Sequence, residues 1–250
     1  MVDLLYTELL KLKRSRMFLL SVIGAAVAPF MVVVSTYIHI KTKEPTRVIP
    51  FQELLFNSHL YTVLLIGVPL YGVVTAYLFN REYMEDTLKN LLTIPVSRTS
   101  LMLSKMLLLF MWIMLLSLLA WGLTLLLGVV GQFEGLSASL LVESLRKFMI
   151  TGAFLSMLST PLILIAIVLK NYVPTIIATI VITLINVMGS NSEYKGLIPW
   201  TAAFDIAHGT LLQLTRRHIL IWSLGLSRSS DSLPPLPTSE RRTFINARND

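Results

Sequence analysis

The chain has 250 residues, of which 54% are hydrophobic and 14% charged, with 21 lysines and arginines against 14 aspartates and glutamates. That charged share is well below the roughly 25% of soluble globular domains, and the apolar residues come in blocks of about twenty, the length that crosses ~30 Å of hydrocarbon. We therefore expect an all-α, polytopic membrane helical bundle with five clear transmembrane helices in a lipid bilayer. The absence of cysteine excludes disulfides and thiolate metal sites. In such a protein the basic balance indicates topology signals and no nucleic-acid partner.

Residues 1–16 predict an amphipathic helix in the membrane interface. Their leucines recur at helical spacing and oppose polar residues, which is typical of a helix lying in the interface plane. A positively charged flank of the first span is the alternative. The polar residues assigned to this helix are Glu8, Lys11, Lys13 and Arg14. Under either interpretation, the positive residues favour a cytoplasmic N-terminus in the cell membrane.

A transmembrane domain is expected over residues 17–217, and its first two spans are predicted at 17–38 and 60–79. The polar residues 39–57 between them are predicted to form the first outer loop. Three basic residues spread along this loop argue mildly against an outside location, but the denser N-terminal group outweighs them. Gly67, Pro69 and Gly72 predict a flexible or closely packed middle of the second span.

Residues 80–100 form a polar segment between two long apolar runs. Residues 80–94 have the pattern of a short amphipathic helix, which Pro95 ends because a proline disfavours helical geometry at the preceding residue. Ser97 or Thr99 is expected to cap the next helix. A charged helical elbow between two membrane spans is a surface that a membrane subunit would offer to a cytoplasmic partner.

Three more spans follow, predicted at 101–130, 148–169 and 173–188, the last with Pro174 in its first turn. As one helix, residues 101–130 would be about 45 Å long, so the helix is expected to tilt or to project into the cytoplasm near Ser104 and Lys105. Residues 131–147 are predicted to be the second outer loop. Residues 196–200 are predicted to be an interfacial outer segment anchored by Trp200.

Residues 218–250 are predicted to be a degenerate, disordered C-terminal tail. Residues 218–226 would cover only about 13 Å as a helix, which is too short for a sixth span, and the residues beyond are rich in serine, proline and arginine. If the N-terminus is cytoplasmic, five spans place the end of the fifth span outside, so the tail is expected to be extracytoplasmic. The abrupt change in composition is interpreted as a frameshift or truncation.

No catalytic, cofactor or metal site is predicted in this chain. It contains no GxxxxGK[ST] phosphate loop. Its histidines, His39, His59, His208 and His218, lie at predicted loop or span edges without metal-ligand spacing, so solvated or interfacial positions are expected. Four of the five predicted spans lack ionisable residues in their central portions, whereas ion-coupled transporters usually carry them. Transport by this chain would therefore need another energy source.

Residues 82–98, with the sequence EYMEDTLKNLLTIPVSR, and Lys105 beyond them resemble the signature of type-2 ATP-binding-cassette (ABC) exporter permeases. Residues 8–15, with the sequence ELLKLKRS, are similar to the opening interface helix of that family. Within the family, the bacitracin and lantibiotic resistance permeases look most similar. The resemblance covers about residues 1–210.

The resemblance implies six helices per subunit, a second permease subunit in a homodimer or heterodimer, and a separate ABC ATPase that carries ATP and Mg²⁺. It implies that the ATPase docks on the elbow, through Glu82, Glu85, Thr87, Lys89, Pro95 and Arg98. Two departures are visible. Asp86 stands where the family commonly has glycine, which would stiffen the joint, and the sixth span is missing or degenerate after Arg217.

The leading functional hypothesis is the membrane subunit of an ATP-driven exporter that moves an amphipathic peptide antibiotic or lipid-like substrate for self-protection. An alternative is a non-transporting membrane immunity or scaffold protein that sequesters such a peptide. A third is a membrane enzyme acting on lipids, which is ranked lowest because no acid/base constellation is visible.

Overall fold

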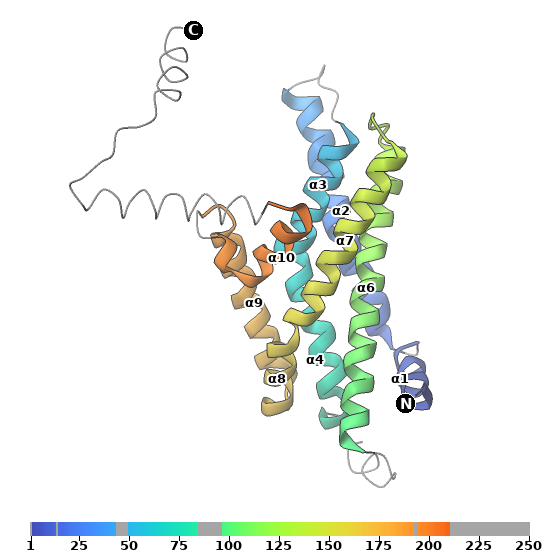
Figure 1. Ribbon diagram of the computed structural model, residues 1–250, viewed down its shortest axis with the longest axis vertical. Coiled ribbons are helices and arrows are strands. Elements are labelled where there is room, and N and C mark those ends of the chain that lie inside the picture. The colour runs from blue at the N-terminus through green and yellow to red at the C-terminus, as the bar shows by residue number, and fades with distance from the viewer. Residues whose placement is uncertain (1, 14, 44–49, 85–96, 193–194, 211–250) are drawn as a thin grey trace, which may run out of the picture. The chain divides into compact units, whose positions relative to one another are not determined.

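The computed structural model describes residues 2–13, 15–43, 50–84, 97–192 and 195–210. These residues are almost entirely helical and contain no strand, and a single isolated bridge joins Pro50 to Glu134 within them. Figure 1 shows the elements: α1 (Val2–Lys13), α2 (Arg16–Lys43), α3 (Phe51–Tyr61), the π-helix η1 (Thr62–Gly67), α4 (Val68–Met84), α6 (Arg98–Val130), α7 (Ala138–Leu158), α8 (Thr160–Leu169), α9 (Tyr172–Gly189), the 3₁₀ turn η2 (Lys195–Leu197) and α10 (Pro199–His208).

Five stretches of the described chain are helical, long and apolar enough to cross a membrane, as predicted. They are Arg16–His39, Phe51–Met84, Thr99–Val130, Ala138–Leu169 and Tyr172–Gly189. The second joins α3, η1 and α4 into one helical run, and the fourth joins α7 to α8. The predicted all-α, multi-pass membrane bundle is confirmed. The predicted tail at 218–250 lies outside the described residues.

The two predicted outer loops are wrong in extent, because helices enter both of them. α3 begins at Phe51, and Phe51, Leu54 and Leu55 form its buried face at helical spacing. The polar residues between these buried positions lower the mean hydropathy of the stretch, so that it resembles a loop. Likewise α7 begins at Ala138, after the Ser137 hydroxyl accepts a hydrogen bond from the Leu140 amide at 3.2 Å.

The middle of the second span is a π-helix, which has a local cause in Pro69. A proline has no amide hydrogen and cannot donate to the carbonyl four residues before it, which favours a change of hydrogen bonding upstream. The rearrangement falls at η1, one residue before α4 begins. Gly67 is required there, since a Cβ atom would lie 2.6 Å from the Thr62 carbonyl oxygen.

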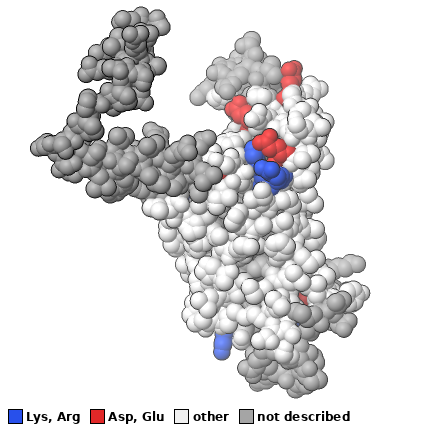
Figure 2. Space-filling model, in the orientation of Figure 1, with Lys and Arg blue, Asp and Glu red and all other residues white. Residues whose placement is uncertain are grey.

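α6 is central to the packing, contacting α1, α2, α3 and α7, while α4 packs on α8 and α9. Ile113 and Leu116 of α6 are fully buried in the hydrophobic core. By contrast, α2 and α9 expose many large apolar side chains, including Leu19 and Leu184, which suits contact with lipid. Figure 2 shows the uncharged middle of one face, with charged atoms gathered near the end where α7 begins.

α10 was not predicted. The sequence indicated only an interfacial segment at 196–200, whereas the chain turns through η2 and continues as a helix to His208. α10 packs against α7, and Ala203, Phe204 and Ala207 bury its apolar face. A ten-residue helix is too short to span the bilayer, so hydropathy gave no signal for it.

Candidate functional site

Two residues of the predicted elbow lie at helix ends. Glu82 is in the last turn of α4, so the separate elbow helix predicted from residue 80 is wrong over 80–84: these residues continue the second span. Arg98 is the first residue of α6, and Ser97 caps that helix as predicted, since its hydroxyl accepts from the Ser100 amide at 3.2 Å. The other predicted elbow residues, Glu85, Thr87, Lys89 and Pro95, lie outside the described residues.

The predicted N-terminal helix is present as α1, which contains Glu8 and Lys11 and ends at Lys13; Arg14 lies outside the described residues. Leu12 of α1 is buried in the hydrophobic core. α1 also packs on α6. Contacts with the helical bundle therefore hold α1 in place, in addition to any contact with the membrane interface.

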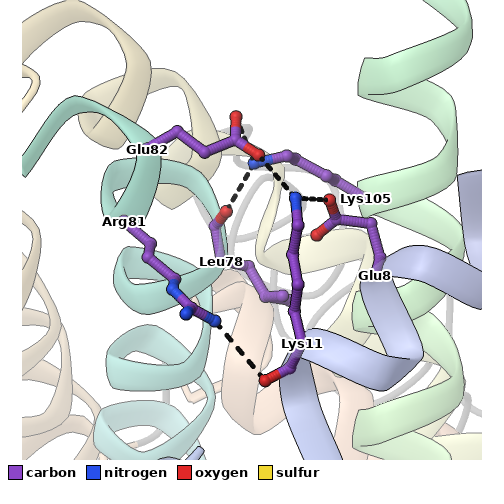
Figure 3. A network of polar contacts seen from close by, with 6 residues as sticks. All are labelled: Glu8, Lys11, Leu78, Arg81, Glu82 and Lys105. Atoms are coloured by element: carbon purple, nitrogen blue, oxygen red, sulfur yellow. Dashed lines mark hydrogen bonds and ion pairs between the residues drawn. The ribbon is translucent and has the colours of Figure 1, made fainter. Parts of the chain in front are cut away.

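Four charged side chains from three helices meet at the base of the elbow (Figure 3). Lys105 Nζ of α6 lies 2.9 Å from Glu82 Oε2 of α4 and donates to the Leu78 carbonyl oxygen at 2.9 Å. Glu82 Oε1 lies 3.4 Å from Lys11 Nζ of α1, which pairs with Glu8 Oε1 at 2.7 Å. We call Glu8, Lys11, Glu82 and Lys105 the charge brace.

Most of the charge brace is withdrawn from solvent. Glu8, Glu82 and Lys105 are 6%, 7% and 4% exposed. A buried ion is costly unless it is paired and hydrogen-bonded. Here two carboxylates face two ammonium groups, so the formal charges balance. The Lys105 side chain, near the start of α6, points into the protein and pairs with Glu82.

Arg81 makes a second contact between α1 and α4, in addition to the Lys11–Glu82 ion pair. Its Nη1 atom donates to the Lys11 carbonyl oxygen at 3.5 Å, and its guanidinium lies 5.5 Å from the Tyr77 ring centre. Burial opposes protonation of Lys11, but hydrogen bonds and charges from Glu8 and Glu82 outweigh it and raise the pKa of Lys11 above its usual value. Lys11 therefore stays charged at neutral pH, as its ion pairs with Glu8 and Glu82 require.

Sequence reasoning selected three of the four brace residues, Glu8, Lys11 and Glu82, but as separate elbow and interface residues. Lys105 was named only as part of the family motif and as a position near the cytoplasmic end of the third span. A physical signal for Lys105 was available, because a lone lysine within a long apolar helix requires a buried partner or a functional role. No signal in the sequence pointed to Arg81.

A second polar cluster lies where α3, α7 and α10 meet. His59 is 3% exposed, so the expectation of a solvated or interfacial histidine is wrong for it. Its ring stacks on Phe148 with centres 4.2 Å apart, and the His208 ring centre is 5.1 Å away. His39 is exposed, as expected, and His218 lies outside the described residues. Within the described part of the chain, no group of three or more potential ligands is arranged to hold a metal.

Five membrane-length helices, with a buried charge brace where α1, α4 and α6 meet, define a multi-pass helical membrane protein. The chain belongs to the ABC-2 family of transporter proteins, whose family model matches residues 4–186. It is 58% identical over 170 residues to the bacitracin transport permease protein BCRB of Bacillus licheniformis, an alignment that covers 68% of this chain and 82% of that protein. The resemblance to permeases of the bacitracin-resistance branch is thereby confirmed. No solved structure matches the chain.

Proposed function

We propose that this chain is the permease subunit of an ATP-driven exporter in the cell membrane, and that its substrate is bacitracin or a similar amphipathic peptide or lipid-like molecule. ATP and Mg²⁺ bind to a separate ABC ATPase, and a second permease subunit completes the complex. The observation that carries the proposal is the charge brace at the base of the elbow. The substrate is proposed from the name of the relative and the 58% identity to it.

The brace suits the transmission of movement from a docked ATPase. The segment 85–96 leaves α4 just after Glu82 and enters α6 seven residues before Lys105. A displacement of that segment therefore reaches both helices close to the Glu82–Lys105 ion pair. Since α1 joins the same pair through Lys11, α1, α4 and α6 would move as one body.

This geometry divides the proposed docking residues into two groups. Glu85, Thr87, Lys89, Pro95 and Arg98 are proposed to form the joint that faces the ATPase. Glu82 is proposed to be a positioning residue, because its carboxylate is buried and already paired with Lys105 and Lys11. It would set the direction in which the segment leaves α4.

The proposed function is tested by bacitracin resistance in a sensitive bacterial host. Co-expression with a partner ABC ATPase should raise the inhibitory concentration of bacitracin at least several-fold. Inactivating the catalytic glutamate of that ATPase should abolish the increase. Full resistance with the inactive ATPase would contradict ATP-driven export and favour the sequestering alternative.

The proposed topology predicts which side of the membrane each end of α6 faces. The chain has no cysteine, so single cysteines can be introduced at Leu136 and Thr99, which are exposed and leave both capping serines intact. Leu136→Cys should react with an impermeant maleimide in intact cells, and Thr99→Cys only after lysis. The reverse pattern would place the elbow outside and exclude ATPase docking there.

A further inference from the structure

Two cavities lie side by side around α10, on either side of Phe56 and His208. The first, of about 320 Å³, lies between α3, α7 and α10 and includes His59 and Phe148 in its wall. The second, of about 250 Å³, lies between α3, η2 and α10, and its lining includes Phe204 and Asp205. Phe56 and His208 line both, with ring centres 5.3 Å apart. Together they reach the size of small-ligand sites.

The wall between the cavities is aromatic. Phe204 packs on His208 with ring centres 4.1 Å apart and on Phe56 at 5.5 Å, while His59 joins the group at 5.0 Å from Phe204. Burial lowers the pKa of His208, so this ring is neutral at physiological pH. The faces of aromatic rings attract cations and apolar groups alike.

Asp205 has an unused hydrogen-bond acceptor beside the second cavity. It lines that cavity and is 3% exposed. Its Oδ1 atom lies 3.2 Å from Lys195 Nζ and accepts from the Thr210 hydroxyl at 2.9 Å. Its Oδ2 atom has no hydrogen-bond partner among the described residues. A buried carboxylate oxygen favours a hydrogen-bond donor, and a protonated amine is a strong, charge-assisted donor.

The charge of the lining points to the same ligand class. The charged residues that line the two cavities are Glu53, Glu143, Asp205, Lys147 and Lys195. Each lysine is already paired, Lys147 with Glu143 at 2.6 Å and Lys195 with Asp205. An anionic ligand would have to break one of these pairs, whereas a cation would not.

We propose that these two cavities form a binding site for an organic ammonium ligand, whose amine pairs with Asp205 and whose apolar body packs on Phe56 and Phe204. The inference rests on the proposed function and deepens it: the substrate would be an amphipathic molecule with a free amino group.

The site lies far from the charge brace but on the same helical run. His59 and Glu82 are 23 residues apart along α3, η1 and α4, about 35 Å at 1.5 Å per residue. Figure 1 shows α3 and α10 toward one end of the helices and α1 and the end of α4 toward the other. Ligand binding and the elbow would thus act on opposite ends of the same helical run.

The test is binding to the purified full chain in lipid nanodiscs, without the ATPase. Three probes that share a phenylethyl group are compared by calorimetry: phenethylammonium, neutral 2-phenylethanol and anionic 3-phenylpropanoate. Phenethylammonium should bind at least tenfold more tightly than either of the others. Asp205→Asn should remove that preference, while Glu134→Gln, an exposed carboxylate-to-amide control in the loop before α7, should keep it.

Equal binding of 2-phenylethanol, absence of ammonium binding, or an unchanged preference in folded Asp205→Asn would each overturn the proposal. If Asp205→Asn does not fold, Leu64→Trp tests the site instead, because the larger side chain fills the second cavity and leaves the Asp205 carboxylate in place. That variant should lose phenethylammonium binding, and retained binding would overturn the site. The binding measurement involves neither bacitracin nor ATP, so its outcome is independent of the resistance assay. Either experiment can fail while the other succeeds.

Discussion

Lys105→Met is expected to be among the most damaging single substitutions in the described chain. Methionine replaces most of the apolar stem of the lysine but leaves the buried Glu82 carboxylate without its 2.9 Å partner. Removing one member of a buried ion pair typically destabilises a protein by about 3–5 kcal/mol. Lys11 still lies 3.4 Å from Glu82, so the loss should fall near the lower figure. Thermal or denaturant unfolding in nanodiscs measures it.

The double variant Glu82→Leu/Lys105→Met separates stability from function. It removes both charges together, so no unpaired ion remains in the interior, and such replacements are often close to neutral. Most of the lost stability should return. If the charge brace transmits movement from the elbow, bacitracin resistance should remain absent in this folded variant.

Glu143→Gln provides the matched control for stability. It removes a carboxylate from an ion pair, but that carboxylate side chain is 57% exposed, and exposed pairs contribute less than about 1 kcal/mol. Equal stability losses in Glu143→Gln and Lys105→Met would contradict the assignment of a buried brace. Full resistance in the double variant would show that the brace only stabilises the fold.

Gly72→Ala is expected to force α4 and α9 apart. A Cβ atom at this position would overlap Thr179 Cγ2 and lie 2.8 Å from Thr179 Cβ, and a change of the Thr179 rotamer cannot relieve the second contact. Added atoms in a packed interior typically destabilise by about 1–3 kcal/mol, and this contact is severe enough to reach the upper end. The unfolding midpoint in nanodiscs should fall accordingly.

Two further variants make this prediction specific. Gly122→Ala in α6 adds the same methyl group where nothing lies within 4 Å, and it should leave stability unchanged or slightly raised, because alanine favours a helix over glycine. Gly72→Ala/Thr179→Gly removes the clashing side chain and should restore part of the loss. A Gly72→Ala protein as stable as Gly122→Ala would mean that the α4–α9 approach is looser than described.

The sequence by itself determined the features that depend on local chemistry. Five apolar blocks predict five spans because each must cover the hydrocarbon thickness, and this was confirmed. Ser97 was a predicted cap, and Pro174 lies in the first turn of α9 as expected. The family was also visible from residues 82–98, since that motif is contiguous in the chain.

Only the tertiary structure decided which polar groups face inward. Glu82 was predicted from the sequence to be a docking residue of the polar elbow, yet it pairs with Lys11, 71 residues away along the chain, and with Lys105. His59 was predicted to lie at the edge of a span in a solvated or interfacial position, yet α7 and α10 enclose it. Periodicity assigns residues to faces of a helix, but the burial of a face depends on the helices that pack against it, and those contacts join residues distant in sequence.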